Sequence, residues 1–146
     1  MPFTEPLVLR LEFPSSLHVL DTLQAAGEQW CRDAGFDDDA VYGIGVAFRE
    51  AVVNAIRHGN RETPGKHVRA ELQRTVGALR GVVLTVRDEG TGFDADAVAD
   101  PLAPENLLKG SGRGVFLMRS FMDDVVIGRG PGGGTEVRMS KFLSKG

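Results

Sequence analysis

The chain has 146 residues, of which 42% are apolar and 25% are charged, an ordinary globular composition that excludes an intrinsically disordered chain. The formal net charge of −3 gives no electrostatic reason to expect binding to nucleic acid or to a membrane surface. No run approaches the roughly 18 apolar residues of a membrane span, and the N-terminus lacks the pattern of a signal peptide. We therefore expect a single domain over residues 1–146, located in the cytoplasm.

Hydrophobic periodicity predicts five strands and three helices along the chain. In order, we expect a strand over 7–13, helices over 17–34 and 37–58, strands over 68–73 and 82–86, a short helix over 115–122, and strands over 125–127 and 135–142. Residues 90–114 show no strong period, and segments of this length in compact domains are usually functional or disordered.

The spacing of these elements also predicts how they assemble. The strand over 82–86 is the most continuously apolar and should be central, and the short links 77–81 and 130–134 are typical of hairpins. Several hairpins together with three helices indicate an α+β protein. We expect a two-layer α/β sandwich, with the helices on one face of a mixed, mainly antiparallel sheet.

The second helix carries the first candidate pair. Its core stripe is centred on Phe48, and Glu50 and Asn54 fall on the other face at about 100° per residue. They lie four residues apart, so their side chains are neighbours. One interpretation is a solvated polar face. The other is a carboxylate base beside an amide ligand for Mg²⁺, which prefers oxygen and needs few protein ligands when phosphate oxygens are present.

A second candidate is Asp88, directly after the predicted central strand. Its carboxylate can accept from an exocyclic amine such as that of adenine. Gly90 and Gly92 follow, and residues without side chains let a flat ligand approach the backbone closely. The alternative is a tight turn in which the aspartate only supports the backbone.

Two glycine-rich stretches complete the candidates. Gly110, Gly112 and Gly114 surround Arg113 at the start of the predicted short helix, where exposed N–H groups and positive potential favour a phosphate. Flexible loops have the same composition, and neither the P-loop nor the dinucleotide fingerprint is matched. The other stretch, residues 132–134, is typical of a hairpin, although Thr135 after it could hydrogen-bond a ligand.

The order of these motifs, Glu-x-x-x-Asn, Asp-x-Gly-x-Gly-Phe, Gly-x-Gly-Arg-Gly and Gly-Thr, resembles the Bergerat-fold ATPase and kinase superfamily. The chain is most similar to the anti-sigma factor serine kinases, notably in residues 50–59 (EAVVNAIRHG) and 112–119 (GRGVFLMR). The likeness spans nearly the whole chain, and the combination of motifs is specific where each motif alone is not.

The resemblance implies a set of roles for these residues. Glu50 would be the base that activates a protein serine hydroxyl, and Asn54 would bind Mg²⁺. Asp88 would hold the adenine amine of ATP, with Thr135 nearby and with Gly90 and Gly92 allowing close approach of the base. The phosphates would be lined by Gly110, Gly112, Arg113 and Gly114, under a mobile lid over residues 94–109.

The resemblance also implies a function, that of an ATP- and Mg²⁺-dependent serine kinase. Such a protein binds a sigma factor, phosphorylates an anti-anti-sigma protein on serine, and commonly forms a homodimer. The alternative is a nucleotide-dependent binding module that transfers nothing. Glu50 favours the kinase, because a pure binder needs no base. The catalytic domain of a histidine kinase would need a helical hairpin that the 14 residues before Ser15 cannot supply.

Overall fold

The structure, a computed structural model, describes residues 7–77, 79–90 and 112–143. Within them the strands are β1 (Leu7–Pro14), β2 (His67–Thr75), β3 (Gly81–Arg87), β4 (Asp124–Arg129) and β5 (Thr135–Phe142). The α-helices are α1 (Leu20–Ala34), α2 (Asp38–Asn54) and α4 (Gly112–Phe121). A 3-10 turn, η1 (Leu17–Val19), precedes α1, and a π-helical turn, η2 (Ala55–Gly59), continues α2.

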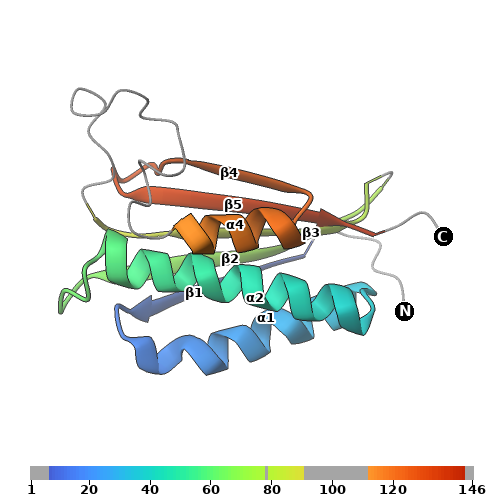
Figure 1. Cartoon of the computed structure of the whole chain (residues 1–146), viewed down its shortest axis with the longest axis horizontal. Helices are drawn as coiled ribbons and strands as arrows, with labels where there is room; N and C mark the ends of the chain where they lie inside the picture. The colour runs from blue at the N-terminus through green and yellow to red at the C-terminus, as the bar shows by residue number, and fades with distance from the viewer. Residues whose placement is uncertain (1–6, 78, 91–111, 144–146) are drawn as a thin grey trace.

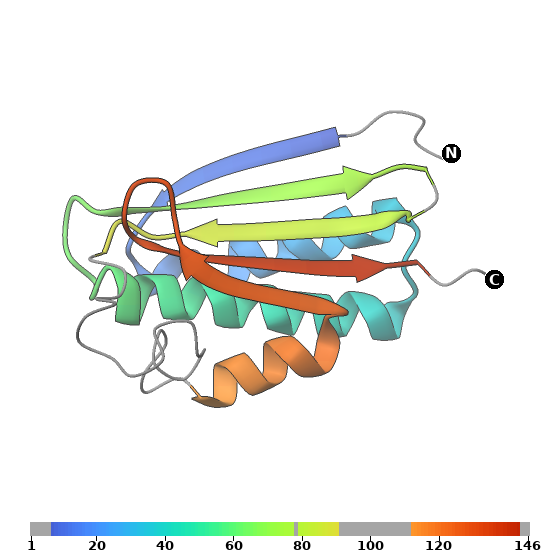
Figure 2. The same cartoon turned by 90° about the horizontal axis from the view of Figure 1, so that it is seen from above.

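The strands form one sheet in the order β1-β2-β3-β5-β4, and β3 is its central strand (Figure 2). All four pairings between the described strands are antiparallel. The expected α+β sandwich is therefore confirmed, without the parallel pairing that a mixed sheet would contain. Continuous apolar runs are typical of parallel strands, but β3 is antiparallel to both of its neighbours. Its apolar run is explained by its central place, because residues 81–86 are all buried.

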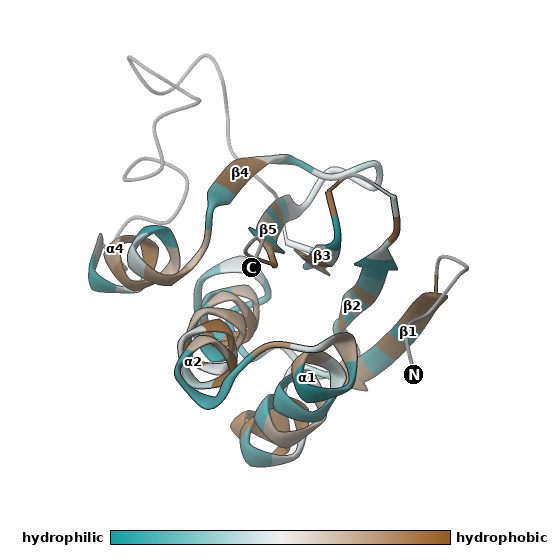
Figure 3. Cartoon of the chain, turned by 90° about the vertical axis from the view of Figure 1, so that its right-hand side faces the viewer, coloured by the Kyte–Doolittle hydropathy of each residue, from teal (hydrophilic) through white to brown (hydrophobic). Residues whose placement is uncertain are grey.

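The helices form a single layer on one face of the sheet, with α2 between α1 and α4 (Figures 1 and 3). Phe48, in the middle of α2, is fully buried in the core. Glycines let the neighbouring helices approach, since a Cβ on Gly27 of α1 would lie 2.9 Å from the Phe48 ring. A Cβ on Gly43 of α2 would similarly meet the ring of Phe121 of α4 at 2.5 Å.

Local sequence explains where the first two helices begin and end. Ser16 caps η1, because its side chain accepts a bond from the His18 N–H. Asp37 caps α2 by accepting from the Ala40 N–H at 2.9 Å, as aspartate does at many helix starts. Gly35, which ends α1, has a φ of 106°. That left-handed conformation favours glycine.

The predicted strands agree with the observed ones to within two residues, whereas three helix ends differ by more. The first three residues of the first predicted helix form a 3-10 turn. The short helix begins at Gly112, three residues before the predicted start, so the glycine motif forms its first turn. The last turn of the second predicted helix is π-helical rather than α-helical. The predicted lid over residues 94–109, together with Gly92 and Gly110, lies outside the described residues. In the part of the chain described, no helix is long and apolar enough to cross a membrane.

Candidate functional site

The end of α2 meets the start of α4, which brings Glu50, Asn54 and Gly114 together. A Cβ placed on Gly114 would lie 3.0 Å from Glu50 Oε2 and 3.2 Å from Asn54 Nδ2. Glycine is needed here because a larger side chain would press on both polar groups. The first turn of a helix also carries N–H groups with no partner inside the helix, and these attract anions. The two motifs, 60 residues apart in the sequence, thus form one polar site.

Asn54 is not on a solvated face, because its side chain is buried with only 2% of the residue exposed. Its Nδ2 has no hydrogen-bond partner among the described residues. A buried amide without a partner is costly, which favours a role in holding a ligand. This excludes the simple interpretation of the pair as a solvated polar face.

The donor set at this point suits Mg²⁺ in company with phosphate. Among the described residues no group of three His, Cys, Asp or Glu side chains is placed to hold a metal ion, so these residues alone would not complete a metal shell. Mg²⁺ usually binds through one or two protein oxygens and takes its other ligands from waters and substrate phosphates. The Asn54 amide beside the α4 N-terminus fits that pattern through Oδ1, whereas its Nδ2, unpartnered among the described residues, is a hydrogen-bond donor that suits a phosphate oxygen and not the metal.

Asp88 follows β3 and is held by backbone groups of two neighbouring segments. Its Oδ1 accepts from the Gly90 N–H at 2.9 Å and from the Thr135 N–H at 3.1 Å. The Asp88 N–H in turn donates to the Thr135 carbonyl at 3.1 Å. Both side-chain bonds end on Oδ1, so the carboxylate has a fixed orientation and Oδ2 is the oxygen available to a ligand.

Glycines from three segments surround this carboxylate. A Cβ on Gly59 would overlap Asp88 Oδ2, and a Cβ on Gly134 would lie 2.7 Å from Asp88 Oδ1. A Cβ on Gly90 would overlap the Gly59 carbonyl. The sequence analysis identified Gly90, left Gly59 just beyond the predicted second helix and interpreted Gly134 as part of a hairpin. Only the tertiary structure shows that these glycines converge on Asp88, where a larger side chain would overlap its carboxylate.

Burial raises the pKa of the Asp88 carboxyl above its ordinary value of 3.8. The bonds from the Gly90 and Thr135 N–H groups oppose this shift, and the charge of Lys66 opposes it more weakly. The cause is desolvation, which penalises the charged form. A ligand that donates a hydrogen bond to Oδ2 would offset that penalty, and an exocyclic amine is such a donor.

The other predicted residues that the structure describes, Gly112, Arg113 and Thr135, belong to elements at the same end of the molecule. Thr135 is 94% buried, and its backbone is hydrogen-bonded to Asp88, so these two residues lie side by side. Arg113 is exposed in the first turn of α4, directly after Gly112. The ends of α2 and β3 and the starts of α4 and β5 gather at the left of Figure 2. The ligand roles assigned to these residues stay predictions.

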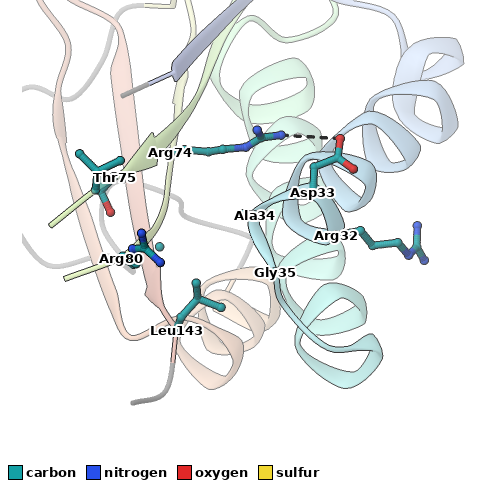
Figure 4. A pocket seen from close by; sticks show the side chains of 10 residues that line it. Arg32, Asp33, Ala34, Gly35, Arg74, Thr75, Arg80 and Leu143 are labelled. Atoms are coloured by element: carbon teal, nitrogen blue, oxygen red, sulfur yellow. Dashed lines mark ion pairs between the residues drawn. The ribbon is translucent and has the colours of Figure 1, made fainter. Parts of the chain in front are cut away.

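A pocket of about 450 Å³ opens at the opposite end of β3 (Figure 4). It lies beside Gly81, at the start of the strand that ends next to Asp88. Arg74 on its wall pairs with Asp33 at 3.7 Å and stacks on the Trp30 ring, with its guanidinium carbon 4.2 Å from the ring centre. Neighbouring side chains thus already compensate the buried charge of Arg74, so this charge needs no ligand in the pocket. The volume of the pocket alone does not make it the functional site.

The comparisons with known proteins agree with this geometry. Residues 13–141 match the family described as the histidine kinase-like ATPase domain. The chain belongs to this family, and an ATPase domain implies nucleotide binding.

Individual relatives define the class of protein more narrowly than the family does. The chain is 42% identical over 113 residues to an anti-sigma F factor of Bacillus velezensis and 41% identical to that of Bacillus subtilis, covering 73% of each chain in both cases. It is an anti-sigma regulator of the kinase family. The fold also matches the crystal structure of the RsbU and RsbW domains of a Mycobacterium tuberculosis protein, with a TM-score of 0.61 and 22% identity. That match covers 98% of this chain and 34% of the other.

Proposed function

We propose that this protein is an ATP- and Mg²⁺-dependent protein serine kinase that binds a sigma factor and phosphorylates an anti-anti-sigma protein on serine. The observation that carries the proposal is the contact of Gly114 with both Glu50 and Asn54. It brings a carboxylate, a buried amide and a helix N-terminus together at the end of the sheet where Asp88 is held. The relatives named anti-sigma F factor support the choice of partners.

Asp88 Oδ2 would accept a hydrogen bond from the adenine amine, with Gly59, Gly90, Gly92 and Gly134 leaving space for the base. The phosphates would lie against the first turn of α4, near Gly112, Arg113 and Gly114, with Gly110 before it and Thr135 beside Asp88. The segment 94–109 would close over them.

Asn54 would be the protein ligand of Mg²⁺, and the bound ion would neutralise charge on the phosphate oxygens. Glu50 is the proposed general base. It would take the proton of the substrate serine hydroxyl while the serine oxygen forms its bond to the γ-phosphorus. The bond from that phosphorus to ADP breaks in the same transfer. Phosphoryl transfer depends mostly on positioning and charge stabilisation, and this arrangement supplies both.

The experiment is incubation with labelled ATP, Mg²⁺ and each candidate anti-anti-sigma protein. We expect label on a serine of one of them. Glu50→Gln keeps the size of the side chain and removes the basic oxygen, so it should slow transfer by about 10² to 10⁴, the usual range for general-base catalysis. ATP affinity should stay within twofold, because a base acts in the transition state.

Asn54→Ala is the matched comparison on the same helix. It should weaken ATP binding in the presence of Mg²⁺ and change it little without the metal, because it removes a proposed metal ligand. Transfer at the normal rate by Glu50→Gln would refute the kinase mechanism. Binding of ATP and a sigma factor without any labelled partner would instead favour a nucleotide-dependent binding module.

We also propose that the protein works as a homodimer in the cytoplasm, where transcription takes place. β1 is an edge strand, and its side chains Leu7, Val8 and Leu9 are 37–42% exposed. Exposed apolar edge strands commonly pair with another chain. Sedimentation equilibrium should give twice the chain mass, whereas a monomer at micromolar concentration would contradict this assignment.

A further inference from the structure

Asn60, the residue after η2, is a fully buried polar side chain that no motif in the sequence analysis included. Its Nδ2 donates to Ser15 Oγ and to the His67 carbonyl, both at 2.8 Å. Its Oδ1 accepts from the Glu89 N–H at 2.7 Å. One amide therefore connects the end of β1, the start of β2 and the segment after β3 to the end of the α2 helix.

The bond to Glu89 fixes the backbone next to Asp88. Asn60 follows Gly59, the residue packed against Asp88 Oδ2. Glu89 follows Asp88, and Gly90 packs in turn against the Gly59 carbonyl. The segments 59–60 and 88–90 thus lie backbone against backbone, and the Asn60 amide bonds across them. A change in this bond would shift Asp88 relative to the end of α2.

The chain after Asn60 is strained, which indicates that the position of Asn60 is constrained. Arg61 and Glu62 have φ values of 52° and 54°, in the left-handed region that is unfavourable for residues other than glycine. The turn is held by a bond from the Glu62 N–H to the Ile56 carbonyl at 2.8 Å. Such strain persists where the surroundings determine the backbone, and it clusters at functional sites.

We propose that Asn60 is a positioning residue for recognition of the nucleotide base. It contacts no nucleotide itself. It holds the Asp88 carboxylate in register with the end of α2, so that Oδ2 meets the exocyclic amine of adenine. The inference rests on the proposed role of Asp88.

The test compares the affinities for ATP and GTP by calorimetry in the full chain, at a temperature where circular dichroism shows each variant to be folded. Guanine carries a carbonyl oxygen where adenine carries its amine, so a well-placed Asp88 favours ATP. Simple destabilisation reduces the folded fraction and weakens both nucleotides equally. Displacement of Asp88 weakens ATP alone, so the ATP/GTP affinity ratio separates positioning from stability.

Asn60→Ala should lower ATP affinity at least tenfold and leave GTP affinity within twofold. Asn60→Asp keeps an acceptor for the Glu89 N–H but loses both donors, so it should recover most of the ATP/GTP ratio while remaining less stable. Ser15→Ala is the matched control, because it removes a partner of Asn60 just after the end of β1 and leaves the Glu89 bond intact. Its ratio should equal that of the wild type.

A wild-type ratio in folded Asn60→Ala would overturn the inference. If that variant fails to fold, Asn60→Ser is measured in its place, because the serine side chain is too short for its hydroxyl to bond the Glu89 N–H. Asp88→Asn separates the proposed positioning role of Asn60 from the proposed binding of adenine by Asp88. A reduced ratio in Asp88→Asn with a normal ratio in Asn60→Ala rejects only the positioning role. A normal ratio in Asp88→Asn rejects the adenine assignment and, with it, this inference.

Discussion

The two ends of the sheet each hold a charged side chain with restricted access to water, and the groups that surround that charge differ between the two ends. At one end the buried Arg74 meets the carboxylate of Asp33 and the face of Trp30. At the other end the half-buried Asp88 accepts hydrogen bonds from backbone N–H groups, and the backbones of three glycines pack closely around its carboxylate. Arg74 is compensated by an opposite charge, whereas the bonds to Asp88 come from the backbone, end on Oδ1 and leave Oδ2 for the proposed ligand.

This difference indicates what marks a binding site in a small protein. The pocket beside Arg74 has the volume, but its buried charge already has a partner of opposite sign. The Asp88 end has a desolvated carboxylate whose hydrogen bonds come from the backbone and not from a side chain of opposite charge. Five substitutions, two of them controls, test the comparison.

Asp88→Asn should have the largest effect on nucleotide binding. The variant places an amide where the adenine amine needs an acceptor, which should cost about 2 kcal/mol or more, or roughly thirtyfold in affinity. Calorimetric titration with ATP measures it directly. Unchanged affinity would remove the reason for placing the base at this end of the sheet.

Arg74→Ala should act on stability alone. Loss of the stacking on Trp30 and of the pair with Asp33 should lower the free energy of unfolding by about 2 kcal/mol. Asp33 is half exposed and can be solvated, so the larger penalty of an isolated buried charge does not apply. The measurement is urea unfolding, together with ATP affinity at a temperature where the variant is folded.

The control for Arg74 is Arg10→Ala, which breaks an exposed ion pair with Glu71. It should change stability by less than about 0.5 kcal/mol. If Arg74→Ala also reduced ATP affinity in the folded protein, the two ends would not be independent.

Gly134→Ala should reduce ATP affinity about tenfold and stability by about 1–3 kcal/mol, because the added methyl presses on Asp88. Gly132→Ala, two residues earlier in the same hairpin, meets no atom within 4 Å and should stay within about 0.5 kcal/mol of wild type. Titration and urea unfolding of the pair separate a specific contact from general hairpin flexibility. Equal behaviour of the two variants would contradict the role given to Gly134.

The smallest effect concerns pH in the absence of nucleotide. Because burial raises the pKa of Asp88 in the folded state, the charged form costs stability as the pH rises from 3.8 through the folded pKa. Asp88→Asn should therefore raise the melting temperature at pH 7. The gain should shrink as the pH falls toward 3.8, where the wild-type carboxyl is protonated. A lower melting temperature for the variant at pH 7 would show that its charge stabilises the fold.

Much of the fold could be predicted because it depends on local pattern. The short link 77–81 and the apolar run in β3 indicated a hairpin and a central strand, and both are observed. The predicted end of the first helix at residue 34 and start of the second at 37 lie within one residue of the observed ones, where Gly35 and Asp37 act as caps. The start of α4 was predicted too late, because glycines have low intrinsic helix propensity and only the packing of Gly114 against α2 explains their place in a helix.

The candidate site likewise has features that the sequence determined and features that depend on the tertiary structure. The sequence by itself determined the residue types, namely a carboxylate and an amide one turn apart on α2 and an aspartate after a buried strand. The tertiary structure alone decided that Asn54 is buried and that Gly59 and Gly134 converge on Asp88. It also decided that Asn60 links three strand ends. Burial and convergence arise from contacts between segments far apart in the chain, and no local period records which segments will meet.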